Sequence, residues 1–216
     1  MKNVVSILIL VFISFALSGQ EPAYYYNLLL KKLHAADSIY EEKTYQELSN
    51  VCERIIKVTD NEWLPYYYKA YADINLGFMS EDEEEKDVFY DYAQEKVNKA
   101  MDIRPDESEL YVLQALLYFG RMEIRSMSRV MVYFPKAEAS LEKAEALNRN
   151  NPRVYYLKGQ SMLYKPGFMG GGPEAAKPLL EKALKLFDEY QKPHRVYPSW
   201  GLNKTKALYQ ICISEP

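Results

Sequence analysis

Few residues in this chain have the types and spacing that catalysis or metal binding requires. The two histidines, His34 and His194, lie far apart in the sequence, and no serine or cysteine stands in a motif typical of a nucleophile. Two histidines and two cysteines, Cys52 and Cys212, are also too few for a multi-ligand zinc site. We therefore predict no enzymatic activity, no catalytic residue, no metal site and no cofactor.

A glycine cluster at Gly170, Gly171 and Gly172 could bind an anion, because it precedes a predicted helix start at Pro173. However, the chain contains neither the phosphate-binding loop pattern of nucleotide hydrolases nor the glycine pattern of dinucleotide-binding folds. Proline at a first helical position is an ordinary helix start. The cluster is therefore predicted to be a tight connecting loop.

Two charged segments are candidates for a binding function. The acidic run at 80–87 lacks the aspartate and glycine spacing of a calcium loop, so a solvated loop or helix face is predicted. Arg121, Arg125 and Arg129 would form one basic stripe if a helix continued through them, and three methionines lie nearby. This second segment is interpreted either as a lengthened helix packed on its neighbour or as a contact for an acidic partner.

The elements that must position these residues repeat along the chain. A triplet of small or aliphatic residues at i, i+4 and i+7 occurs four times, and this spacing places all three on one helix face. A second series pairs an aromatic residue with a small one four residues later, and both series step by about 44 residues. The triplets begin at Leu48, Ala93, Ala137 and Ala176, and the pairs are Tyr66 with Ala70, Tyr111 with Ala115 and Tyr155 with Gly159. Two coordinated series with one period indicate a helix-pair repeat.

This pattern resembles the tetratricopeptide repeat (TPR), in which small residues let paired helices and successive pairs pack closely. The period exceeds the family's usual length of about 34 residues, because extra residues separate the two helices of units two to four. The resemblance implies an all-α, right-handed helix-pair solenoid over residues 19–216, with about four pairs and a C-terminal capping helix. The pairs are expected at about 23–41 with 44–58, 62–77 with 88–103, 107–131 with 135–148, and 152–164 with 173–190, and the cap at about 199–213.

Residues 1–18 are predicted to be a signal peptide. Lys2 precedes an apolar run over 4–17, and the small residues Ala16 and Ser18 have the spacing of a cleavage site. The run is shorter than the roughly 20 residues of a membrane span, so no stable membrane insertion is expected after cleavage; an uncleaved anchor is the alternative. The YPSWG segment at 197–201 and the glycine loop are similar to short exported TPR proteins of Gram-negative bacteria. The mature protein is therefore expected to be periplasmic or secreted.

The resemblance also implies a binding surface, because TPR ligands usually lie along the concave face. A net charge of −3 without a basic patch argues against nucleic acid as the partner. Tyrosine is unusually frequent, with 20 residues, and it suits peptide recognition because it buries a large area and keeps a hydroxyl group. The residues predicted to face the partner are Tyr67, Tyr71, Asn75, Val112, Leu116, Phe119, Tyr156, Gln160 and Tyr164.

Two functions from different classes fit these observations. The first is a non-catalytic exported scaffold that binds a protein or peptide partner in the aromatic concave groove. The alternative is a periplasmic carrier of a small apolar or aromatic ligand. An open solenoid predicts the scaffold, whereas a pocket of several hundred Å³ closed by residues 165–173 or 191–198 predicts the carrier.

Overall fold

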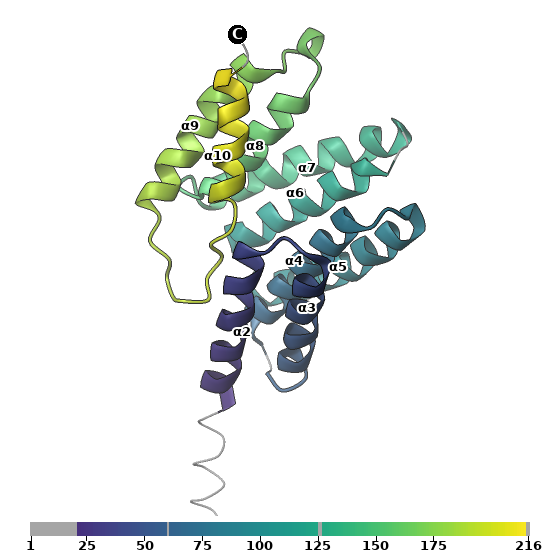
Figure 1. Ribbon diagram of the computed structural model, residues 1–216, viewed down its shortest axis with the longest axis vertical. Coiled ribbons are helices and arrows are strands. Elements are labelled where there is room, and N and C mark those ends of the chain that lie inside the picture. The colour runs from purple at the N-terminus through teal and green to yellow at the C-terminus, as the bar shows by residue number, and fades with distance from the viewer. Residues whose placement is uncertain (1–20, 60, 125–126, 215–216) are drawn as a thin grey trace, which may run out of the picture.

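The computed structural model describes residues 21–59, 61–124 and 127–214, and over these ranges the chain forms helices and no strand (Figure 1). The α-helices are α2 (Glu21–Ser38), α3 (Glu42–Ile56), α4 (Trp63–Met79), α5 (Glu83–Ile103), α6 (Ser108–Glu123), α7 (Met127–Leu147), α8 (Pro152–Tyr164), α9 (Pro173–Glu189) and α10 (Leu202–Ser214), with a 3-10 turn η1 (Gly167–Met169). None of these helices is long and apolar enough to cross a membrane. The predicted signal peptide lies outside the described residues.

Consecutive helices pack in pairs, and the pairs stack in chain order from α2 and α3 to α8 and α9 (Figure 1). α10 packs mainly on α9 and caps the stack, so the predicted all-α helix-pair solenoid is confirmed. The small repeat residues are buried where helices approach most closely. A methyl group placed at Gly159 would lie 2.6 Å from the Leu180 side chain of α9, which explains why this position needs glycine.

The acidic run at 80–87 lengthens a helix instead of forming a long loop. α5 begins at Glu83, and the Asp82 side chain caps it by accepting a hydrogen bond of 2.8 Å from the backbone N–H of Glu85. Carboxylates in this first turn also lie at the positive end of the helix dipole. Extra residues of this repeat unit therefore lie within α5, which is 21 residues long.

The predicted basic stripe on one long helix over 107–131 is wrong. α6 ends at Glu123, and Ile124 takes an extended conformation with its side chain buried, so the chain turns before α7 begins. Arg121 and Arg129 consequently lie on different helices, and both approach Asp87 of α5, at 3.7 and 2.5 Å. The Arg129 guanidinium donates two hydrogen bonds to the Asp87 carboxyl and thereby lowers its pKa. The remaining member of the stripe, residue 125, lies outside the described residues.

The ring of Tyr90 in α5 packs against Gly77 of α4 and Gly120 of α6. A methyl group at Gly77 or Gly120 would lie 2.5 or 2.7 Å from the tyrosine ring. The Tyr90 hydroxyl is buried, and no residue in the described part of the chain accepts or donates a hydrogen bond to it. The ring is therefore held by packing and not by its polar group.

This packing gives a prediction about stability. Gly120→Ala should lower the free energy of unfolding by about 1 to 3 kcal/mol, because the new methyl group overpacks the contact with Tyr90. Tyr90→Phe should leave stability unchanged or raise it slightly, since it removes an unpaired buried hydroxyl. Urea unfolding followed by circular dichroism measures both. Equal destabilisation by the two substitutions would show that the hydroxyl has a partner.

Candidate functional site

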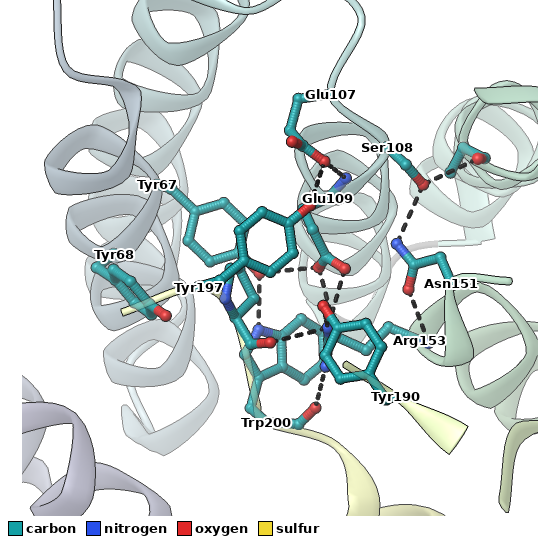
Figure 2. Close-up of polar contacts among 12 residues, drawn as sticks. Tyr67, Tyr68, Glu107, Ser108, Glu109, Asn151, Arg153, Tyr190, Tyr197 and Trp200 are labelled. Carbon is teal, nitrogen blue, oxygen red and sulfur yellow. Dashed lines mark hydrogen bonds and ion pairs between the residues drawn. The ribbon is translucent and has the colours of Figure 1, made fainter. Parts of the chain in front are cut away.

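The segment between α9 and α10 packs over helices that belong to three different pairs (Figure 2). Its residues 196–200 lie against the N-terminal ends of α4, α6 and α8. Trp200 Nε1 donates a hydrogen bond of 2.7 Å to the Tyr67 hydroxyl, and the Tyr68 hydroxyl donates one of 2.8 Å to the Val196 carbonyl. The Trp200 ring also stacks on Tyr71, with centroids 5.2 Å apart. The chain therefore covers this part of the helix stack with its own irregular segment.

A buried ion pair lies beneath this segment. Arg153 of α8 and Glu109 of α6 are 0 and 1% exposed, and two hydrogen bonds of 2.8 and 3.0 Å join them. The same guanidinium donates to the carbonyls of Pro198 and Trp200 at 2.9 and 3.0 Å (Figure 2). The pair thus fixes both the stacking of two repeat units and the position of the covering segment.

The sequence analysis did not select this ion pair, although a signal for it exists. Glu109 and Arg153 each stand two residues before the aromatic residue of the repeat, so they hold equivalent positions in consecutive units. Stacked units bring equivalent positions close together. Opposite charges at such positions therefore predict an inter-unit ion pair.

The structure divides the nine predicted binding residues into two groups. Six lie buried in the helix stack, and three of them, Tyr67, Tyr71 and Tyr156, contact Trp200 of the covering segment. These six are Tyr67, Tyr71, Asn75, Val112, Leu116 and Tyr156. The other three, Phe119, Gln160 and Tyr164, stand toward the C-terminal ends of α6 and α8 and line an open groove. A role of the nine residues in binding a partner stays a prediction.

The groove lies between the C-terminal ends of α6 and α8, the first half of α7, and η1. Its volume is about 710 Å³, and its lining is almost entirely apolar. Several of the apolar residues have little cover from the rest of the protein: Met127 is 75%, Met131 74% and Phe168 91% exposed. The lining comprises Phe119, Met122, Glu123, Met127, Val130, Met131, Phe134, Pro135, Gln160, Ser161, Tyr164, Lys165, Pro166, Phe168 and Met169.

The predicted tight loop at 170–172 directly follows the groove residues Phe168 and Met169 and is confirmed. Gly170 and Gly172 have φ angles of 81° and 109°, a region that favours glycine. A methyl group at Gly171 would lie 2.1 Å from the Lys165 carbonyl oxygen, so the backbone can fold closely onto the end of α8 only without a side chain there. This compact loop positions Phe168 and Met169 at the rim.

Two charged residues line the groove, and their environments differ. Glu123 lies 3.9 Å from the Lys86 ammonium, and burial raises its pKa while Lys86 and Lys204 oppose that shift. Lys165 forms no ion pair with a carboxylate in the described ranges. The buried side-chain oxygen of Gln160 also has no hydrogen-bond partner within those ranges. Among the described residues, the groove therefore offers an apolar surface with one cation, one carboxylate and one buried acceptor.

This arrangement suits the binding of an apolar molecule. A volume of about 710 Å³ falls within the range of about 300 to 1,000 Å³ that is typical of small-molecule sites. Methionine and aromatic side chains adapt to a large flat ligand, because methionine is flexible and polarizable and aromatic rings stack. The groove can therefore hold a planar apolar molecule of considerable size.

Comparison with known proteins supports a helical binding scaffold. The chain is similar to the solved structure of the HusA haemophore from Porphyromonas gingivalis, with a TM-score of 0.79 and 29% identity over 88% of this chain and 94% of that one. It is also similar in fold to the crystal structure of a thermophilic TPR protein from Thermus thermophilus, with a TM-score of 0.58, 18% identity, and coverage of 88% and 91%. No family model and no curated protein matches the chain.

Proposed function

We propose that this TPR-like protein is a non-catalytic exported carrier that binds haem or a related porphyrin in the apolar groove beside α7. The observation that carries the proposal is the groove itself, with its volume of about 710 Å³ and its methionine and aromatic lining. Residues 165, 166, 168 and 169 form part of its wall, and they belong to the segment that the carrier alternative places beside the ligand. Similarity to a haemophore over most of both chains supports a porphyrin as the ligand class.

Several properties of the lining favour a porphyrin over an extended peptide. A porphyrin presents two broad apolar faces, which match the apolar side chains of α6, α7 and η1. A peptide would bring a row of backbone N–H and C=O groups that need hydrogen-bond partners. The groove offers few of these, since its polar side chains are limited to Glu123, Gln160, Ser161, Lys165 and the Tyr164 hydroxyl.

The scaffold interpretation would place a peptide partner on the concave face. At the N-terminal ends of α4, α6 and α8 this requires residues 196–200 to leave, which would break the hydrogen bonds of Trp200 with Tyr67 and of Val196 with Tyr68. It would also remove two carbonyl partners from the buried Arg153. The carrier proposal needs no such rearrangement.

The direct test is a titration of the purified protein with haemin. We expect a saturable absorbance change with one ligand per chain and a dissociation constant on the order of 1 μM or lower. A linear, unsaturable change would indicate non-specific adsorption and would contradict the proposal. Saturation transfer from bound ligand to the methyl groups of the groove methionines gives an independent readout of location.

A second expectation concerns the iron of the haem ligand. The two histidines of the chain, His34 and His194, do not line the groove, so the usual imidazole ligand for haem iron is missing from it. Iron-free protoporphyrin IX should therefore bind within about tenfold of haemin, a difference of roughly 1.4 kcal/mol. Quenching of porphyrin fluorescence measures this. A loss of more than about a hundredfold would instead assign an iron ligand among the methionines or Tyr164.

A further inference from the structure

We infer that Lys165 binds a carboxylate of the ligand and that the groove therefore selects porphyrins with free acidic side chains. This inference rests on the proposed function and adds the polar group that the ligand must carry. Its basis is the pairing of charges around the groove, the fixed backbone of Lys165 and the apolar character of the remaining wall.

Charge pairing singles out Lys165. Glu123 has cations nearby, with Lys86 at 3.9 Å and Lys204 also acting on its carboxyl. Lys165 has no carboxylate within ion-pair distance among the residues that the structure describes. A single uncompensated ammonium beside an apolar surface attracts an anion that can enter with an apolar body.

The backbone of Lys165 is held in place by its neighbours. The Lys165 N–H donates a hydrogen bond of 3.1 Å to the Ser161 carbonyl at the end of α8. Gly171 packs directly against the carbonyl oxygen of Lys165. A lysine so placed can lay its methylene groups along the apolar wall while the ammonium reaches the rim. The carbonyl groups at the end of α8 repel an anion, so the ammonium must provide the attraction.

Haem-type porphyrins suit this arrangement chemically. They carry apolar substituents along much of the ring and carboxylates at one edge. If the ring lies on the methionine and aromatic side chains, that edge can reach Lys165, while esterification of the acids would remove the charge and keep the ring. The identity of the acidic group is therefore testable without changing the apolar part of the ligand.

The experiment combines a change in the protein with a change in the ligand. Dissociation constants are measured for protoporphyrin IX and its dimethyl ester with the parent protein, Lys165→Met and Lys165→Arg. We expect Lys165→Met to weaken binding of the diacid about tenfold and binding of the ester less than twofold, and Lys165→Arg to retain binding of the diacid. Lys185→Met, on the exposed surface of α9, is the matched control and should change neither.

The possible results separate this inference from the proposed function. If Lys165→Met weakens both ligands equally, the side chain contributes packing alone and the inference is overturned while the carrier proposal stands. The same conclusion follows if the variant weakens neither ligand. If the parent protein binds neither porphyrin, the carrier proposal fails and the inference falls with it. A salt dependence of diacid binding that disappears in Lys165→Met would support the charge pairing directly.

Discussion

Replacing Met131 by glutamate should abolish most porphyrin binding while leaving the fold intact. Met131 lines the groove and is 74% exposed in the absence of a ligand, so glutamate can replace it without loss of core packing. Once a porphyrin covers the position, the carboxylate would lose water without gaining a partner in the apolar wall. We expect the dissociation constant to rise at least about thirtyfold, or roughly 2 kcal/mol.

The control for this experiment is Tyr92→Glu. Tyr92 is an exposed apolar side chain of α5 that does not line the groove, so the same type of substitution tests general surface effects. Both variants should have a free energy of unfolding within about 0.5 kcal/mol of that of the parent protein. Equal loss of binding in the two variants, or undiminished binding in Met131→Glu, would place the ligand somewhere other than the groove.

The largest effect on stability is expected from Glu109→Leu. The substitution leaves the Arg153 guanidinium buried without its carboxylate, and breaking a buried pair in this way costs about 3 to 5 kcal/mol. Since Arg153 also holds the carbonyls of Pro198 and Trp200, the covering segment should loosen together with the pair. Urea unfolding measures the first effect, and faster hydrogen exchange in residues 190–201 measures the second.

Two companion variants test the physical reason. Glu109→Leu combined with Arg153→Met removes both charges, so it should recover part of the lost stability. Glu189→Leu breaks the exposed pair between Lys185 and Glu189 on α9, and it should change stability by less than about 0.5 kcal/mol. If the double variant is less stable than Glu109→Leu, the hydrogen bonds of Arg153 to the covering segment outweigh its loss of a charge partner.

Glu109 and Arg153 also separate the stability of the fold from ligand binding. They lie near the start of α6 and α8, whereas the groove is formed at the other ends of these helices. A partly destabilised Glu109→Leu protein should therefore still bind porphyrin at low temperature, where it remains folded. If binding decreases only as much as the fraction of unfolded protein increases, the ion pair affects stability and not the groove, as expected.

Much of the fold could be predicted from local sequence signals. Ala70, Ala115 and Gly159 recur at the repeat period because each allows a close helix contact, and their spacing predicted the helix pairs. The fourth pair was placed almost to the residue, since Pro152 and Pro173 mark the starts of α8 and α9. The signal peptide over residues 1–18 remains a prediction.

The candidate site was predicted only in part. The resemblance to TPR proteins selected Phe119, Gln160 and Tyr164, which line the groove, but it also selected Tyr67 and Tyr71, which contact the chain's own segment. Repeat periodicity cannot distinguish these cases, because all five residues occupy equivalent helix faces. Whether a face is open depends on the segments that pack over it.

The sequence alone therefore determined the helix-pair architecture, because helix periodicity and small-residue contacts depend on residues only a few positions apart. Only the tertiary structure decided which part of the concave face is open. Trp200 meets Tyr67 across 133 positions of the chain, and the groove joins α6, α7, α8 and η1, which share no local sequence signal. Such contacts form when distant apolar surfaces bury each other, so no single stretch of sequence encodes them.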